Sequence, residues 1–272
     1  MLPNGWYPRD SWQVSSEISR FLSEFTPSPV SAAAIAPHAG WYYCGGLIAR
    51  AVSALKPDAD TVVVLGGHLP PGRRPLFAME DAVRTPFDPM PIDAELRHVL
   101  LEKLNGESDR FSDNTVEVLL PMVRFFFPNA KLLWLRLPAE LASFEAGKII
   151  SQAAAKLNRK LNVLASNDLT HYGRNFGFAP KGLGHEALRW VREENDAGFI
   201  RAIESGNTAE VLERAERGRA ACSAGAVLGV MGFVFAEKLG NIRLLEYSTS
   251  ADVTGETSPD SFVGYAAICA AA

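Results

Sequence analysis

The sequence predicts an α/β protein, a three-layer α/β/α sandwich around a mostly parallel, mixed central sheet. Short apolar runs rich in β-branched residues alternate with longer segments of helical periodicity. The length of 272 residues allows one large core, so we expect residues 1–272 to form a single domain. Apolar residues make up 47% and charged residues 21%, a globular balance that argues against disorder.

The first half of the chain alternates helix and strand. Apolar residues at helical spacing predict a helix over 14–25 and a second helix over 45–55. Between them, 32–36 is a short apolar run that ends at a proline; after the second helix, 61–68 is an unbroken β-branched run. Such runs suit strands buried on both faces of a sheet. The stretch 66–75, rich in glycine and proline, predicts a long loop.

The second half repeats this alternation. Apolar runs predict four further strands, at 131–136, 161–166, 242–248 and 262–267. Helical periodicity predicts four further helices, at 144–157, 184–204, 208–217 and 224–238. Because functional sites of α/β sheets gather at the carboxyl ends of strands, the residues just after each strand are the first candidates for chemistry.

Three of the five histidines follow predicted strands: His38, His68 and His171. His38 and His68 belong to one strand-helix-strand unit, which brings both to the same edge of the sheet. Imidazole suits zinc, copper, iron and nickel, and catalytic metal sites commonly use three protein ligands. The pattern predicts a metal site that includes His38; the alternative is that each histidine only forms hydrogen bonds in a loop.

Two further segments offer reactive groups. Asp168 precedes His171 by three residues, so its carboxylate can orient the imidazole, bind a metal or act as a general base. Alternatively, Ser166, Asn167 or Asp168 caps a following helix. Cys222 stands just before an apolar helix, whose N-terminus lowers a thiol pKa and favours the thiolate. It is otherwise a plain buried cysteine, or the nucleophile of a hydrolase.

Aromatic residues follow His38 in the run A-P-H-A-G-W-Y-Y-C-G-G. Trp41, Tyr42 and Tyr43 are candidates for a pocket wall, or for core or lid positions. The two glycines that follow leave helix amides open to an anion, but the absence of G-K-[ST] excludes a Walker-type phosphate loop.

Bulk properties exclude several classes of partner. The net charge of -4 and the pI near 5.8 favour neither nucleic acid nor an anionic membrane. No apolar stretch reaches the roughly 18–20 residues that span a bilayer, and residues 1–20 lack the apolar run of a signal peptide. We therefore expect a cytoplasmic protein with reduced cysteines, in which Cys44 and Cys269 serve packing.

The order and the residues of these sequence segments resemble the Memo family. Its microbial members include the B protein of the AmmeMemoRadiSam system. The family is related in fold to LigB-type class III extradiol dioxygenases. The resemblance covers nearly the whole chain. It rests on A-P-H-A-G-W-Y-Y-C-G, V-L-G-G-H, R-T-P-F-D, S-N-D-L-T-H-Y-G, the turn at Cys222, and S-F-V-G-Y-A-A.

The resemblance implies a metal pocket formed by His38, His68 and Cys222, with Asp168 and His171 alongside to handle protons. It implies one transition metal ion, with iron or copper favoured and zinc possible. It also suggests a functional link to a radical-SAM protein.

A substrate pocket is expected from the same segments, formed by Trp41, Tyr42, Asn114, Glu117 and Tyr172. The sequence departs from the family at two places.

At His68 this chain reads G-G-H-L and needs a one-residue gap against the family pattern. In D-N-T-V-E-V-L-L-P, Asn114 replaces a family histidine and Leu119 a polar residue. An asparagine cannot shuttle a proton near neutral pH, so altered or absent activity is an open outcome.

These observations favour a metal-dependent redox enzyme that acts on a small molecule or a peptide. Two alternatives stay open: a binding module that uses the same pocket without turnover, and a zinc hydrolase in which Asp168 or His171 deprotonates a metal-bound water.

Overall fold

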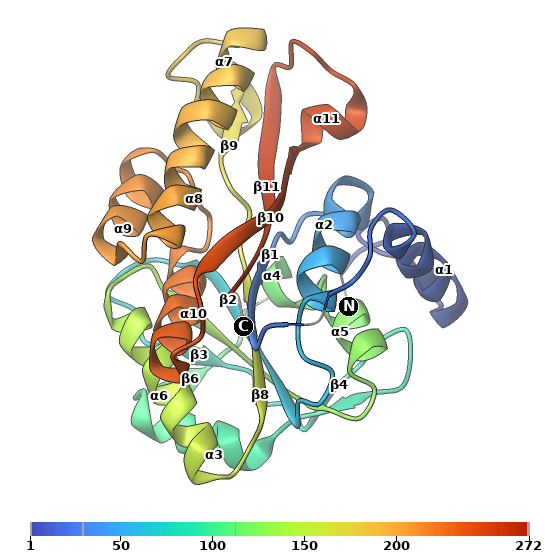
Figure 1. Ribbon diagram of the computed structural model, residues 1–272, viewed down its shortest axis with the longest axis vertical. Coiled ribbons are helices and arrows are strands. Elements are labelled where there is room, and N and C mark those ends of the chain that lie inside the picture. Colours follow the sequence, from blue (N-terminus) through green and yellow to red (C-terminus); the bar gives the residue numbers. More distant parts are fainter. Residues whose placement is uncertain (1, 29, 112, 271–272) are drawn as a thin grey trace.

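The computed structural model describes residues 2–28, 30–111 and 113–270. Its centre is a nine-stranded mixed sheet in the order β10-β11-β1-β8-β2-β7-β3-β6, with β9 paired to β11 (Figure 1). The strands are β1 (Ala33–Ala36), β2 (Thr61–Leu69), β3 (Leu76–Phe77), β6 (Glu107–Ser108), β7 (Lys131–Pro138), β8 (Leu161–Ser166), β9 (His171–Gly173), β10 (Ile242–Thr249) and β11 (Ser261–Ala270).

The middle of the sheet is parallel and its flanks are antiparallel. β1, β8, β2 and β7 pair in parallel, whereas β11 and β10 run antiparallel to the strands beside them. A separate hairpin joins β4 (Ala82–Val83) to β5 (Met90–Pro91). The predicted α/β class with a mixed, mostly parallel sheet is confirmed.

Helices cover both faces of the sheet, which gives the predicted three layers (Figure 1). One face packs against α1 (Ser11–Leu22), α2 (Trp41–Ser53), α4 (Asn114–Glu117) and α5 (Leu120–Phe126). The other packs against α3 (Ala94–Lys103), α6 (Ala142–Lys156), α8 (Ala197–Glu204), α9 (Thr208–Arg217) and α10 (Ala224–Glu237). The shorter elements are η1 (Arg174–Phe176), α7 (His185–Trp190), the π-helical turn η2 (Val191–Asp196) and α11 (Ser250–Thr254).

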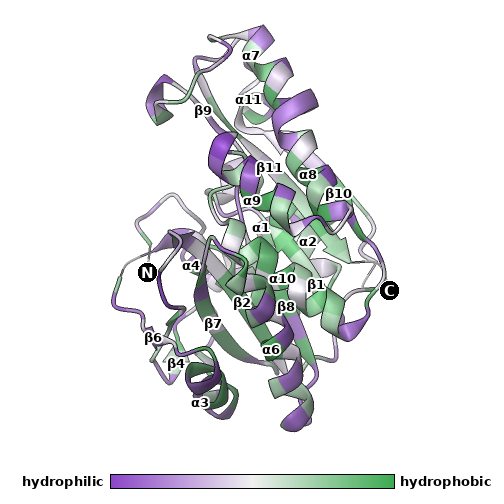
Figure 2. Cartoon of the chain, turned by 90° about the vertical axis from the view of Figure 1, so that its left-hand side faces the viewer, coloured by the Kyte–Doolittle hydropathy of each residue, from purple (hydrophilic) through white to green (hydrophobic). Residues whose placement is uncertain are grey.

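Helix α10 lies at the centre of its layer, because its side chains are apolar on every face. Figure 2 shows it in green beside the central strands, whereas α7 and α9 carry hydrophilic surfaces. Close packing against α6 depends on glycine: a Cβ at Gly147 would come within 1.9 Å of the Gly229 carbonyl oxygen. None of the helices in the described residues is long and apolar enough to cross a membrane.

Several boundaries differ from the prediction; the first helix covers Ser11–Leu22 rather than 14–25. Helix α2 begins at Trp41 rather than near Gly45, because the turn at Gly40 leads directly into it. Strand β2 continues to Leu69 through what was predicted as a loop. The helix expected over 184–204 is divided by the π-helical turn η2.

The sheet places the carboxyl ends of β1, β2 and β8 side by side. Ala36, the last residue of β1, is paired with Ser166, the last residue of β8. The chain leaves β1 towards His38 and leaves β8 towards Asp168, and the His38 amide donates a hydrogen bond to the Asp168 carboxylate at 2.7 Å. Strand register therefore joins two segments that are far apart in the sequence.

Candidate metal centre

Three potential metal ligands meet at this edge of the sheet. His38 follows β1, His68 lies at the end of β2, and Cys222 directly precedes Ser223, the N-cap residue of α10. Their ligand atoms all lie within 4.8 Å of one another, and His38 Nε2 is 3.3 Å from Cys222 Sγ. The two imidazole rings have centroids 5.2 Å apart and are nearly perpendicular. Two nitrogens and one sulfur thus surround one point.

The placement of His68 depends on an irregularity in β2. Its φ of 56° lies in the left-handed region, and the pairing of β2 with β7 shifts between Gly66 and Leu69. Such backbone is uncommon for a residue with a side chain and is typical of a bulge. Gly67 allows the bulge to approach α10, because a Cβ there would lie 2.1 Å from the Ser223 side chain.

Each imidazole forms a hydrogen bond through its Nδ1 atom, the ring nitrogen that faces away from the candidate metal position. His38 Nδ1 is 2.7 Å from Ser166 Oγ, and His68 Nδ1 is 3.1 Å from Asp113 Oδ2. Arg136 also reaches Asp113, at 3.3 Å. Such partners fix the orientation of metal-binding histidines and leave Nε2 for the ion. Burial opposes ionisation of Asp113, but hydrogen bonds from His68 and Thr115 outweigh it and hold its pKa at about 2.

Asp168 links two of the three ligands, His38 and Cys222, to His171. Its Oδ2 atom is 3.9 Å from His38 Nε2 and 3.8 Å from His171 Nε2. The Asp168 backbone N–H donates to Cys222 Sγ at 3.3 Å, and the Cys222 N–H donates to the Asp168 carbonyl at 3.1 Å. Burial opposes ionisation of Asp168, yet the nearby His38 and His171 lower its pKa. The carboxylate is thus ionised between two imidazoles.

The two ligands differ in protonation state: His38 is already in the form that binds a metal, whereas the Cys222 thiol must lose its proton to do so. Burial lowers the pKa of His38, which keeps the imidazole neutral and able to bind a metal. Burial and the Asp168 charge raise the pKa of Cys222 well above its ordinary range. The expected lowering by the helix N-terminus is therefore wrong in sign, because burial outweighs the helix dipole.

A cleft of about 580 Å³ opens over these residues. Its lining includes His38, His68, Asn114, Asp168 and His171. Asn114 also donates to the His38 carbonyl at 3.4 Å. His171, whose side chain is 35% exposed, stacks on Phe176.

A model of the family described as Memo-like protein matches residues 4–269 of the chain. The chain belongs to the Memo-like protein family. The MEMO1 family protein of Pyrococcus abyssi is 30% identical over 283 residues, which cover 97% of this chain and 95% of the relative. The MEMO1 family protein of Methanococcoides burtonii is 30% identical over 244 residues, covering 86% and 84%.

A solved structure shows the same fold. The crystal structure of an uncharacterized protein from Escherichia coli K12 covers 86% of this chain and 98% of its own, with a TM-score of 0.51. The sequence identity is 14%, so the likeness concerns the fold alone.

In this Memo-like protein, four of the residues expected in the substrate pocket do not line the cleft. Trp41 is buried and donates to the Val118 carbonyl at 3.0 Å, whereas Tyr42 points outward and is 69% exposed. Both lie in the first turn of α2, where consecutive side chains face different sides.

Tyr172 and Glu117 are engaged elsewhere. Tyr172 is fully buried, stacks on Phe262 and donates to the Gly182 carbonyl. Glu117 accepts hydrogen bonds from the Leu2 N–H and from the Tyr7 hydroxyl. Of the five expected residues, Asn114 is the one that lines the cleft.

Sequence reasoning missed several contributors. It gave no role to Asp113, although this residue directly precedes Asn114, and it considered Ser166 only as a helix cap. No helix follows Ser166; the chain enters β9, and Asn167 instead accepts from the Ser223 N–H at 2.9 Å. The segment 4–6 also lines the cleft, which no local pattern indicates because the contact spans the whole first helix and strand.

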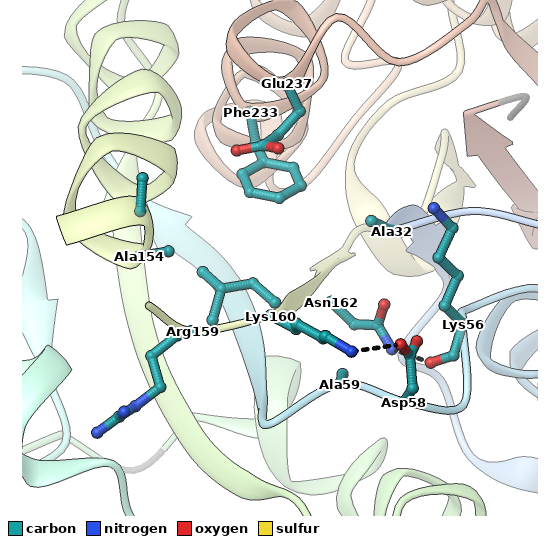
Figure 3. A pocket seen from close by; sticks show the side chains of 12 residues that line it. Ala32, Lys56, Asp58, Ala59, Ala154, Arg159, Lys160, Asn162, Phe233 and Glu237 are labelled. Carbon is teal, nitrogen blue, oxygen red and sulfur yellow. Dashed lines mark hydrogen bonds and ion pairs between the residues drawn. The ribbon is translucent and has the colours of Figure 1, made fainter. Parts of the chain in front are cut away.

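The opposite end of the sheet carries a different cavity, of about 330 Å³ (Figure 3). Two of its cations are paired: Lys160 Nζ is 3.0 Å from Asp58, and Arg159 is 3.1 Å from Asp93. Figure 3 shows the Asn162 amide directed at the Lys56 carbonyl, at 2.7 Å. Within the described part of the chain, the group of potential metal ligands lies at the carboxyl end and not here.

Proposed function

We propose that this Memo-like protein binds one transition metal ion through His38, His68 and Cys222 and uses it in redox chemistry. The convergence of these ligand atoms within 4.8 Å supports the proposal. The residues fit such an ion, because each imidazole has its other nitrogen already engaged and the neutral His38 needs no deprotonation.

The donor set suits iron, copper or zinc, and the proposed redox role requires iron or copper because zinc has no redox chemistry. Two imidazoles and a thiolate are softer than the two-histidine, one-carboxylate set of ring-opening oxygenases. This argues against ring-opening dioxygenase chemistry and in favour of one-electron or oxygen-linked chemistry, which a bound iron or copper ion would supply.

The residues of the chain would bind the ion and move protons. Asp168, ionised between His38 and His171, holds its Oδ2 within 4 Å of both imidazoles. His171 is partly exposed in the cleft and can exchange protons with solvent or substrate. Asn114 stands at the cleft with an amide that orients ligands and does not transfer protons.

The cleft is the expected binding place of a small molecule or of a peptide side chain. Its volume of about 580 Å³ lies in the range of small-ligand sites. Val263 and Tyr265 contribute apolar surface to it, next to the polar Asp168 and His171.

Elemental analysis of protein purified without added metal tests the proposal. We expect iron or copper near one equivalent in the wild type and in His98→Ala, whose exposed imidazole lies on α3. His38→Ala should lose the metal. An absence of transition metal in the wild type, even after anaerobic loading with iron or copper, would overturn the proposal.

Activity assays on the loaded protein separate the alternatives. Oxygen consumption or superoxide formation supports the redox function. Zinc as the bound metal together with ester hydrolysis would instead indicate a hydrolase. A loaded protein that is silent in both assays but binds ligands would indicate a binding module.

A further inference from the structure

The helix from His185 to Glu204 widens at one place, the π-helical turn η2, and two consecutive polar residues of that turn face the interior. Asn195 is 7% exposed and Asp196 is fully buried. A π-helical turn inserts an extra residue into the helix, and such turns are frequent at functional sites. Here the turn directs a buried amide and a buried carboxylate towards the same neighbour.

That neighbour is Thr170, which is fully buried and lies between Asp168 and His171. The Asp196 carboxylate accepts the Thr170 N–H at 3.1 Å and also the Thr170 hydroxyl. The Asn195 amide donates to the Thr170 hydroxyl at 2.8 Å. Backbone and side chain of Thr170 are therefore both fixed by η2.

The same turn also fixes the chain that leads to Cys222. The Asn195 amide donates to the Gly218 carbonyl at 2.7 Å. Gly218 admits this contact, because a Cβ there would lie 2.6 Å from Asn195 Oδ1. Four residues later, the Cys222 N–H donates to the Asp168 carbonyl. One amide side chain thus connects both loops that carry the reactive groups of the cleft.

Asp196 makes this connection without a cation. Its second oxygen accepts the Tyr247 hydroxyl at 2.8 Å, and no ion pair to it occurs in residues 2–28, 30–111 and 113–270. Burial raises its pKa to about 6, although Thr170, Tyr247 and the more distant His171 favour the charged form.

We propose that Asn195 and Asp196 are positioning residues for the metal centre. Through Thr170 and Gly218 they hold the segment 168–171 and the segment 218–222 in a fixed relative position. That this position serves metal binding rests on the proposed function, whereas the fixed position itself does not.

The test compares two substitutions of the same chemistry at opposite ends of the sheet. Thr170→Val removes the hydroxyl that η2 binds. Thr61→Val is the matched control, since the buried Thr61 hydroxyl also donates to a buried aspartate, Asp93, at 2.7 Å. Thr170→Ser keeps the hydroxyl and should behave as the wild type.

Metal affinity, measured by competition with a chromophoric chelator for copper and iron, is the first readout. We expect Thr170→Val to weaken binding about 10–100-fold, the usual effect of losing a group that orients metal ligands. Thr61→Val should bind as the wild type does, even where the two valine variants unfold at similarly lowered urea concentrations. Asn195→Ala, which loses both hydrogen bonds, replaces Thr170→Val if the latter does not fold.

Alkylation of the metal-free protein by iodoacetamide is the second readout. Cys222 is partly accessible, whereas Cys44 and Cys269 are buried and serve as internal references in the mass spectrum. We expect Thr170→Val to change the rate at Cys222 several-fold while Thr61→Val leaves it unchanged. If neither readout distinguishes the two valine variants, the positioning proposal is wrong. If the wild type binds no metal but the Cys222 rate still responds to Thr170→Val, the metal function fails and the positioning role stands.

Discussion

The two ends of the central sheet each contain a buried aspartate that accepts a hydrogen bond from a buried threonine hydroxyl, but within the part of the chain that the structure describes only one of the two aspartates also meets a cation. At the amino end, Thr61 binds Asp93, which also caps α3 and meets Arg159 at 3.1 Å. At the carboxyl end, Thr170 binds Asp196, which has no cation beside it among the described residues.

The electrostatic consequence is opposite at the two ends. Burial opposes ionisation of Asp93, but hydrogen bonds from Thr61, the Leu96 N–H and Arg159 outweigh it and lower its pKa. Burial raises the pKa of Asp196 to about 6. At the amino end, the Asp93 carboxylate is therefore compensated by Arg159 and by hydrogen bonds, which stabilises the fold. The carboxyl end keeps a buried carboxyl that is hydrogen-bonded but has no cation beside it among the described residues, close to the candidate chemistry.

The largest effect is expected from Asp93→Ala at the amino end. It leaves Thr61 and Arg159 without their acceptor and removes the cap of α3, so the free energy of unfolding should fall by about 3 kcal/mol. Urea denaturation measures this fall. Metal affinity should stay within about twofold; a large loss of affinity would mean that the two ends are energetically coupled.

A pH titration of stability should show the opposite signs directly. Because its pKa is raised, Asp196 favours the fold while protonated, and this contribution is lost as the pH rises from about 4 through 6. The difference in unfolding free energy between wild type and Asp196→Asn should fall by up to about 3 kcal/mol over that range.

The corresponding difference for Asp93→Asn should run the other way. Its lowered pKa makes its contribution present above about pH 4 and lost as the pH falls further. Parallel pH profiles for the two variants would contradict the comparison.

A smaller effect is expected from Asp113→Asn, which weakens the hydrogen bond behind His68. Metal affinity should fall about 10–100-fold, or about 1.4–2.8 kcal/mol. The fold should persist, because Arg136 keeps two hydrogen bonds to Asp109. Chelator competition and circular dichroism check the two statements, and an unchanged affinity would show that the Asp113 carboxylate does not support metal binding by His68.

The smallest effect is expected from Lys160→Ala in the amino-end cavity. Its ion pair with Asp58 is exposed and screened by salt, so neither the thermal midpoint nor metal affinity should change measurably. A clear loss of either would show that the cavity of Figure 3 has a role that the paired charges do not suggest.

The sequence predicted the central strands well, because strands buried on both faces read as apolar runs. The runs at 32–36, 131–136 and 161–166 correspond to β1, β7 and β8 with small changes at their ends. The placement of aromatic side chains was less predictable. Trp41 and Tyr42 are neighbours in the sequence, yet the start of α2 turns one into the core and the other into solvent.

By itself, the sequence determined the α/β class and which residue types stand at the carboxyl ends of the strands, because both follow from local periodicity. The strand ends brought His38 and His68 into one hypothesis before any contact was known, and the resemblance to the Memo family added Cys222. The tertiary structure decided the rest: the left-handed bulge that directs the His68 side chain to the site, the burial that raises the pKa of Cys222, and the hydrogen bond of Thr170 to Asp196 in η2. These depend on strand register and on the loss of solvent, which are properties of distant segments packed together and not of any one of them.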